Sequence, residues 1–374
     1  MLEAQVGRDR LKRWLIEQAA PLWASTGWRS DDAVFLEAIG QDGQAVNRPF
    51  RGRVTPRQLY AFAVAERLGA TLPDGLLTRG CETMVSRFQR PDGLFRTLVA
   101  DDGAPLDDSV SLYDQAFVLL ALATLRGKAP NAEETAVRLR HALIERLKYA
   151  DGGFHEAIPP VAPLGSNPHM HLFESFLTWD EAGGDGDWRK LADEVASLAL
   201  ERFIDPTTGA LREFFALDWT PAPGKAGRLV EPGHQFEWAW LLLRWDVERA
   251  GEAAARLIEI GEAYGVDPSR GVAFNGLWDD LTAKDEIARL WPQTERLKAN
   301  VSAAVMLNDP AGWQRAAEAV SGLEAYLNTP VAGLWRDRMN PDGSFIEEPA
   351  PASSFYHIVC AIDVLDRDLK RHKT

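Results

Sequence analysis

Residues 231–243 read EPGHQFEWAWLLL, and residues 167–179 read NPHMHLFESFLTW. Each stretch opens beside a proline, continues with a histidine and a glutamate three positions apart, and then becomes almost entirely apolar. Proline is favoured in the first turn of a helix, and a helix that is apolar on all sides is a buried one. The two stretches therefore predict helices inside the protein whose polar side chains lie near their starts.

Buried helices of this kind recur along the chain and alternate with amphipathic ones. Apolar side chains crowd residues 112–125 and 358–365, whereas 132–149 and 187–203 carry charges along one face. The periodicity predicts about twelve helices, near residues 8–24, 55–69, 74–89, 109–127, 131–149, 168–182, 187–203, 233–249, 251–264, 286–308, 310–328 and 353–370.

Short segments around a glycine separate these helices. The six glycines are 50 to 62 residues apart and are Gly43, Gly93, Gly153, Gly209, Gly271 and Gly333. Glycine supplies the positive φ of a tight turn, and the alternation of polar and apolar residues that follows predicts short strands or extended loops. A period near sixty, with one buried and one amphipathic helix in each unit, indicates six repeated helical hairpins.

Six such units could close into an (α/α)6 barrel or stack as an open solenoid. Solenoid repeats resemble one another more closely and usually run roughly 33 to 47 residues, which favours the barrel. The segment TPAPGKAGRLVEPG at 220–233 predicts a long loop rather than a domain boundary. We therefore expect an all-α fold, a single (α/α)6-barrel catalytic domain over 1–374, with short β-hairpins at the active-site end.

Composition excludes several classes of partner. The net charge of −14 argues against nucleic acid and against an anionic membrane surface. No apolar run reaches the roughly 20 residues that span a bilayer, and the charged first residues lack the core of a signal peptide. With only two cysteines, the protein is expected to be cytoplasmic. We also expect a monomer or homodimer that acts on a small molecule.

One polar or aromatic residue stands near the start of each predicted buried helix. These residues lie 56 to 66 positions apart and are Arg57, Tyr113, His171, His234, Trp291 (with Glu295 one turn on) and His357. In a closed barrel the starts of the inner helices meet at one end, and burying so many polar groups is costly unless they face a polar cavity. The pattern predicts a site at that end.

Two of these histidines carry a glutamate on the same helix face. His171 precedes Glu174 and His234 precedes Glu237 by three residues, so each carboxylate could orient or charge its imidazole. Histidine is the side chain best suited to moving protons near neutral pH. Zinc bound by His169 and His171 is the alternative, but side chains two residues apart on a helix point about 200° apart. We expect no metal and no cofactor.

These motifs, with LWPQTERLKA at 290–299 and PDGSFIEEPAPASSFYHIVCAI at 341–362, resemble the N-acylglucosamine 2-epimerase superfamily. The resemblance covers residues 57–365 and is greatest to its D-mannose isomerase-like branch. It implies an (α/α)6 barrel and metal-independent proton transfer at C1 and C2 of a reducing sugar. It also implies that His234 and His357 are the general acid/base pair, with Glu237 supporting His234.

The same resemblance implies roles for the remaining site residues. His171 would open the sugar ring or bind near O1 and O5, and Arg57 would stabilise the negative charge of an enediolate. The residues expected to bind the monosaccharide are Tyr113, Asn167, Glu174 and Trp291.

The motifs leave the outcome of the reaction open. Return of the proton to C1 gives an aldose–ketose isomerase of the D-mannose to D-fructose type, and return to C2 gives a 2-epimerase of N-acylglucosamine, mannose or cellobiose type. Cellobiose epimerases carry a tryptophan five residues before the last catalytic histidine, where this chain has Ala352. That difference argues against a disaccharide. A phosphorylated sugar is also possible, but the only candidates for binding its phosphate are Lys225 and Arg228, so we expect a free hexose.

Two other functions stay open at this point. An inverting glycoside hydrolase would use two facing carboxylates, for which Glu237 and Glu295 are the candidates. That assignment leaves the histidines without a role. A non-catalytic binding protein is the other alternative.

Overall fold

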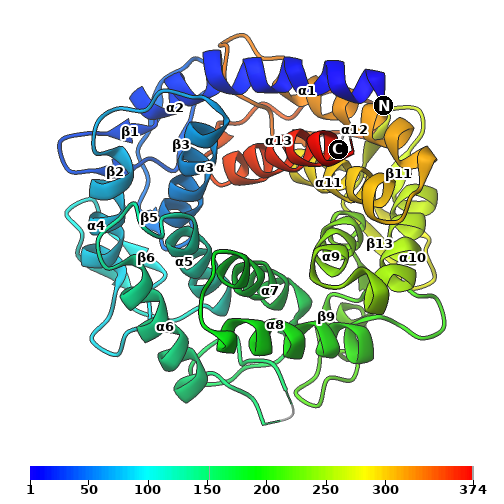
Figure 1. The fold of residues 1–374 in the computed structure, drawn as a ribbon, viewed down its shortest axis with the longest axis horizontal. Coiled ribbons are helices and arrows are strands. Elements are labelled where there is room, and N and C mark those ends of the chain that lie inside the picture. Colours follow the sequence, from blue (N-terminus) through cyan, green and yellow to red (C-terminus); the bar gives the residue numbers. More distant parts are fainter. Residues whose placement is uncertain (151, 373–374) are drawn as a thin grey trace.

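The helices with the most apolar sequences form an inner ring, and the more polar helices wrap around it (Figure 1). The computed structural model describes residues 1–150 and 152–372, so residues 151 and 373–374 of the predicted 1–374 domain lie outside the description. The inner helices are α3 (Val54–Leu68), α5 (Leu112–Thr124), α7 (Ser166–Glu181), α9 (Pro232–Trp245), α11 (Leu290–Met306) and α13 (Ser354–Arg371).

The outer ring begins at the N-terminus. There α1 (Leu2–Trp14) continues through a π-helical turn (Leu15–Ala19) into α2 (Ala20–Ser25). The other outer helices are α4 (Leu76–Phe88), α6 (Ala132–Arg146), α8 (Gly186–Leu198) with its π-helical extension (Ala199–Phe203), α10 (Val247–Gly265) and α12 (Pro310–Leu327). With α1 and α2 counted as one, the described residues form twelve helices, which is the predicted (α/α)6 barrel. None of the helices in the described part of the chain is long and apolar enough to cross a bilayer.

Short strands precede the inner helices, as the glycine segments predict. Five of them run directly into an inner helix: β5 (Phe50–Arg51), β8 (Leu164–Gly165), β10 (Leu229–Val230), β15 (Ala288–Arg289) and β17 (Ala350–Pro351). The others are β1 (Trp28–Arg29), β2 (Val34–Phe35), β3 (Ala38–Ile39), β4 (Ala45–Val46), β6 (Leu98–Val99), β7 (Pro105–Asp107), β9 (Phe214–Phe215), β11 (Val266–Asp267), β12 (Val272–Ala273), β13 (Gly276–Trp278), β14 (Ala283–Asp285) and β16 (Arg338–Met339).

In the described residues, antiparallel strand pairing links five of the six hairpin segments to the next one. Strand β5 pairs with β6, β8 with β9, β10 with β13 and β15 with β16. The last of these strands, β17, pairs with β3 of the first segment, and α1 packs against α12 and α13. The chain thus closes on itself, which an open solenoid does not do.

Buried glutamine side chains attach the inner helices to these hairpins. Gln115 accepts a hydrogen bond from the N–H of Phe95 and donates one to its carbonyl, both at 2.8 Å. Gln235 does the same with Leu211, and Gln293 with Ala273, at 2.7 to 2.9 Å. Each clamped residue lies two positions after a turn glycine, and all six predicted glycines have a positive φ. Each clamp fixes the first turn of a helix against its hairpin.

A histidine replaces glutamine in the third unit. His169 accepts a hydrogen bond from the N–H of Phe154 at Nε2, and its Nδ1 lies 2.9 Å from the carbonyl oxygen of Gly165. Burial lowers the pKa of His169 to about 4, so the ring is neutral and can donate at one nitrogen and accept at the other. Both nitrogens bond the backbone, which leaves none for a zinc ion shared with His171.

The predicted helix boundaries are wrong by four or more residues at three places, one of which is the start of α11, expected at 286 and found at Leu290. The break between helices expected at 249–251 lies at Asp246, whose side chain accepts hydrogen bonds from the N–H groups of Glu248 and Arg249 and so caps α10. The first helix, expected from residue 8, begins at Leu2. Its Gly7 lies against Val320 of α12, a contact that local periodicity does not reveal.

We expect Gln115→Ala to lower the free energy of unfolding by about 2–4 kcal/mol, because it leaves the buried N–H and C=O of Phe95 without partners. Urea titration measures the change. The exposed Gln314 of α12 supplies the control, and Gln314→Ala should cost less than about 0.5 kcal/mol. Equal costs for the two variants would mean that the clamp contributes nothing.

Candidate active site

The first turns of the inner helices surround one cavity of about 200 Å³. Its lining includes Arg57 of α3, Tyr113 of α5, Asn167 and His171 of α7, His234 and Glu237 of α9, Trp291 of α11, and Ser354 and His357 of α13. The structure thus brings eight of the nine predicted site residues together, and the ninth, Glu174, lies behind His171. The cavity is smaller than the roughly 300–1,000 Å³ of drug-sized sites, so it fits one small molecule.

His234 is held by a carboxylate from a hairpin. Its Nδ1 lies 2.7 Å from Glu213 Oε2, and Glu231 Oε2 lies 3.7 Å from the same nitrogen. Burial lowers the pKa of His234, but the two carboxylates outweigh burial and raise it to about 10. His234 is therefore an imidazolium at neutral pH. The hydrogen-bond partner of His234 is therefore Glu213 and not the predicted Glu237, which acts on this ring only by raising its pKa.

His357 is held in the same way but carries no charge. Its Nδ1 lies 2.8 Å from Glu295 Oε1, and Glu295 in turn forms a fully buried ion pair with Lys298 at 2.6 Å. Burial, with the positive charges of Arg57 and Lys298, lowers the pKa of His357 well below 6.5. The neutral ring donates Nδ1–H to Glu295, and its Nε2 keeps a lone pair for a ligand.

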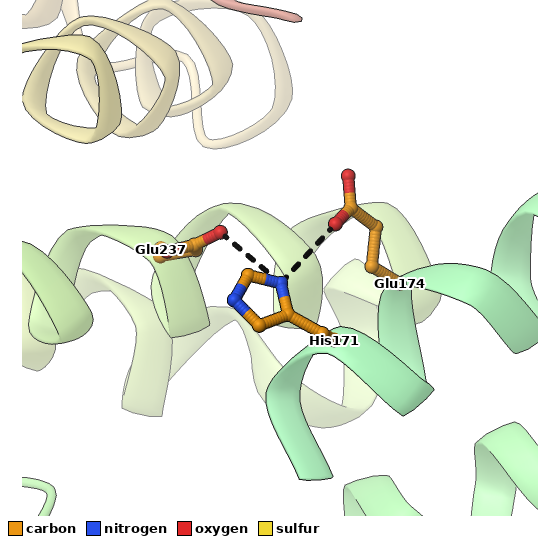
Figure 2. Close-up of side chains that lie close together, drawn as sticks. All are labelled: His171, Glu174 and Glu237. Atoms are coloured by element: carbon orange, nitrogen blue, oxygen red, sulfur yellow. Dashed lines mark ion pairs between the residues drawn. The ribbon is translucent and has the colours of Figure 1, made fainter. Parts of the chain in front are cut away.

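The imidazole of His171 lies between two carboxyl groups (Figure 2). Its Nδ1 is 3.6 Å from Glu174 Oε2 and 3.9 Å from Glu237 Oε1, which is beyond hydrogen-bond range. Burial lowers the pKa of His171 to about 3 despite the nearby Glu174. The sequence-predicted contact with Glu174 is present as proximity, and Glu237 approaches this histidine rather than His234.

The two carboxyl groups beside His171 differ in protonation. Burial raises the pKa of Glu174, but His171, Lys298 and the hydroxyl of Tyr356 outweigh it and lower the pKa to about 2. Burial and the charge of Glu295 raise the pKa of Glu237 well above 4.5, so this group is a neutral acid. Both oxygens of Glu237 are buried without a hydrogen-bond partner in the described residues. They are therefore free to bond a hydroxyl group of a ligand.

Arg57 and Trp291 complete the wall. The guanidinium of Arg57 lies 4.0 Å from the centre of the Phe117 ring and hydrogen-bonds the hydroxyl of Tyr113, which together fix its position. The Trp291 ring lies 4.9 Å from the His234 ring and 5.8 Å from the His357 ring. The site therefore combines a fixed cation, a flat aromatic surface and two imidazoles.

Three clusters in the described residues have side chains spaced closely enough for a cation. Two of them contain His234 and His357, whose Nδ1 atoms already bond Glu213 and Glu295. The third joins His171, Glu174 and Glu237, and burial with the charge of Glu295 raises the pKa of Glu237, which opposes the deprotonation that a metal ligand needs. Activity without a metal stays a prediction, which turnover in the presence of EDTA would test.

Sequence reasoning missed Glu213, Glu231 and Arg289, because it looked for polar groups on helices. Glu213 lies four residues after the turn glycine Gly209, and Asp337 lies four after Gly333 and accepts a hydrogen bond from Ser354 at 3.2 Å. An acidic residue four positions after a turn glycine is therefore a sequence pattern that could have predicted these carboxylates.

Arg289 is the cationic residue at the rim that the sequence did not indicate. It lines the cavity, and its Nη2 lies 3.4 Å from Asp337 Oδ2. The expected phosphate candidates are wrong for this cavity. Neither Lys225 nor Arg228 lines it, and Arg228 pairs with Asp279 and Asp280.

Comparison with known proteins places the chain among sugar-converting enzymes. The family model for N-acylglucosamine 2-epimerase (GlcNAc 2-epimerase) matches residues 35–361. A mannose-6-phosphate isomerase of Rhizobium meliloti (strain 1021) is 48% identical over 389 residues and 99% of both chains. A D-mannose isomerase of Thermobifida fusca is 26% identical over 345 residues and 80% of both. A crystal structure of a D-mannose isomerase has the same fold, with a TM-score of 0.86 at 19% identity over 96% of this chain and 98% of that one.

We expect Glu213→Gln to lower the pKa of His234 by about 1–3 units, because burial then acts without the nearest carboxylate. NMR titration of the imidazole measures the pKa directly. The folded-state pKa lies above 6.5, so the charged ring stabilises the protein fully below pH 6.5 and loses this effect as pH rises towards 10. The variant should lack that pH-dependent stability.

The control is Glu201→Gln, which removes an exposed glutamate elsewhere. An unchanged pKa of His234 in Glu213→Gln would show that Glu213 does not charge the ring.

Proposed function

The chain belongs to the N-acylglucosamine 2-epimerase family and is a sugar isomerase or epimerase, and we propose that it is an aldose–ketose isomerase of a mannose-type hexose. The proposed substrate is the aldose in its open-chain form, and the product is the corresponding 2-ketose. The reaction proceeds by proton transfer through a cis-enediol(ate).

The unequal charge of two imidazoles in one cavity carries the proposal. His234 and His357 both line the cavity, and each bonds a carboxylate through Nδ1, which leaves Nε2 for the substrate. A neutral His357 suits a general base, and the His234 imidazolium suits a general acid. Enolisation of a sugar needs one of each.

In the proposed reaction, His357 takes the proton from C2, and the electrons of the C–H bond form the C1=C2 double bond. Negative charge gathers on O1, where the fixed Arg57 guanidinium and the His234 imidazolium stabilise it. His357 then returns the proton to C1. The His234 imidazolium gives its proton to O1 and takes the proton of O2, so the carbonyl group moves from C1 to C2 and the product is a ketose.

The closed sugar ring must open before these steps. We assign this step to His171, assisted by Asn167, because both lie on α7 and line the same cavity as the acid/base pair, next to α9. Glu237 supports the step because it is a neutral acid with free oxygens beside His171. It can donate a proton to the ring oxygen as the C1–O5 bond breaks, while the neutral His171 takes the proton of the O1 hydroxyl and the C1=O1 double bond forms.

Return of the proton to C2 from the opposite face would make the enzyme a 2-epimerase with the same residues. Similarity to a mannose-6-phosphate isomerase and a D-mannose isomerase supports the isomerase. The small, fully buried side chain of Ala352 supports a single sugar, since it offers no aromatic surface to a second one.

A hydrolase is less well supported. Inverting hydrolysis needs two carboxyl groups facing each other across the bond. Glu295 does not line the cavity and is held by Lys298 and His357.

We expect deuterium at C2 of D-mannose and C1 of D-fructose when the enzyme is incubated with either sugar in D2O. NMR reports both exchange and the identity of the product, and D-glucose, N-acetylmannosamine and cellobiose complete the panel. His357→Ala should lower exchange by about 10²–10⁴-fold, whereas the exposed His141→Ala is the matched control and should retain it. Exchange that appears in no sugar, or that survives His357→Ala, would refute the proposal.

A 6-phosphorylated hexose is the second candidate substrate. The relative at 48% identity is named as a mannose-6-phosphate isomerase, and Arg289 lies at the rim of the cavity with its Nε buried and without a partner in the described residues. A guanidinium is well suited to binding a phosphate through two hydrogen bonds.

If the phosphate ester is the substrate, Arg289→Gln should lower kcat/KM for mannose 6-phosphate by about 10–100-fold and for mannose by less than about threefold. Steady-state kinetics with the two sugars measure the ratio. An equal loss for both would mean that Arg289 does not select for phosphate.

A further inference from the structure

A second cavity lies at the other end of the barrel. It has a volume of about 250 Å³ and is lined by the C-terminal halves of α3, α5, α7 and α9 and by α13. In α3, Arg57 lines the first cavity and Arg67 the second. Ten residues of helix separate them by about 15 Å. The two cavities are therefore separate sites at opposite ends of the inner ring.

Arginines from three helices line this second cavity. They are Arg67 of α3, Arg244 of α9 and Arg367 of α13, and the carboxylates beside them are Glu181 and Asp363. The lining thus carries three positive and two negative side chains. A surplus of positive charge in a partly enclosed space favours an anion.

Two of the arginines are engaged with the two carboxylates. Arg244 forms a two-point ion pair with Glu181 at 2.7 and 2.8 Å, and Arg67 lies 2.8 Å from Asp363. Burial raises the pKa of Glu181, but Arg244, Arg367 and Arg371 outweigh it and lower the pKa, so this carboxylate is charged. These pairs account for the positions of Arg67 and Arg244.

No carboxylate of the cavity lining forms such a close ion pair with Arg367. Its Nε is buried without a hydrogen-bond partner in the described residues. The same Nε lies 3.8 Å from Oδ1 of the adjacent Asp368, which is an ion pair too long for a hydrogen bond. A buried donor left without a partner is costly, unless a ligand satisfies it.

The second cavity is in contact with the residues that hold His357 in place. Cys360 lines the cavity, and its Sγ lies 3.7 Å from Lys298 Nζ. Lys298 is paired with Glu295, which bonds His357. A ligand in the second cavity would therefore lie close to the groups that hold the proposed base.

We propose that the second cavity is a binding site for a phosphate group, held by Arg367 together with Arg67 and Arg244. The arginine fork matches tetrahedral oxyanions through paired N–H donors, and the volume fits one small anion. The site is distinct from the sugar site and does not depend on the proposed isomerase activity.

Calorimetric titration with inorganic phosphate, in a buffer free of other oxyanions, tests the proposal on the full chain. We expect one site in the unaltered protein, and an affinity at least about tenfold lower in Arg367→Gln. Arg13→Gln, which removes an exposed arginine of α1, should bind as the unaltered protein does. Arg289→Gln should retain the binding that Arg367→Gln weakens, because Arg289 lines the other cavity.

Loss of binding in Arg289→Gln but not in Arg367→Gln, or no binding to the unaltered protein, would overturn the proposal. If Arg367→Gln does not fold, Arg367→Lys keeps the charge without the fork and should still weaken binding about fivefold. A parallel titration with glycerol 2-phosphate identifies the source of the group: binding indicates a site that accepts esters, and absence of binding indicates one for inorganic phosphate. Binding that persists in a chain inactive towards every sugar would separate this site from the proposed function.

Discussion

A side-chain amide that bonds both polar groups of one backbone residue sets the geometry of this barrel. Gln115, Gln235 and Gln293 each hold the hairpin of their own unit against the first turn of an inner helix. Three of the site residues, Tyr113, His234 and Trp291, lie within two residues of these glutamines. Because helix and hairpin are fixed to each other, a carboxylate on the hairpin can be placed beside an imidazole on the helix with hydrogen-bond accuracy.

The imidazoles of His234 and His357 differ in charge because the charged groups around them differ. His234 lies next to carboxylates from the loop side of the site, and their negative charge keeps the ring protonated. His357 is buried next to Arg57 and, through Glu295, next to Lys298, and burial together with these positive charges keeps the ring neutral. Two similar His–carboxylate pairs therefore differ in charge because of their second neighbours, and this difference suits the opposite proton-transfer roles that we propose for them. The protein needs no difference in the histidines themselves.

The sequence predicted the barrel and most of the site because both depend on local pattern. Apolar runs and the recurrence of Arg57, His171 and His357 at the starts of helices need no knowledge of contacts. The partner of His234 could not be found in this way, since Glu213 is 21 residues away and on a strand segment. The break at Asp246 was missed because apolar periodicity continues across a capping residue.

The ring is joined at its ends by non-covalent contacts alone, through β17 with β3 and through α1 with α12 and α13. Figure 1 shows the first and last helices side by side at this joint, which resembles the other five. The order in which the peptide bonds connect the six units is therefore not what holds the ring together. A circularly permuted chain, cut between an outer helix and the preceding inner one and rejoined across the present gap, would retain the same cavity at the same end.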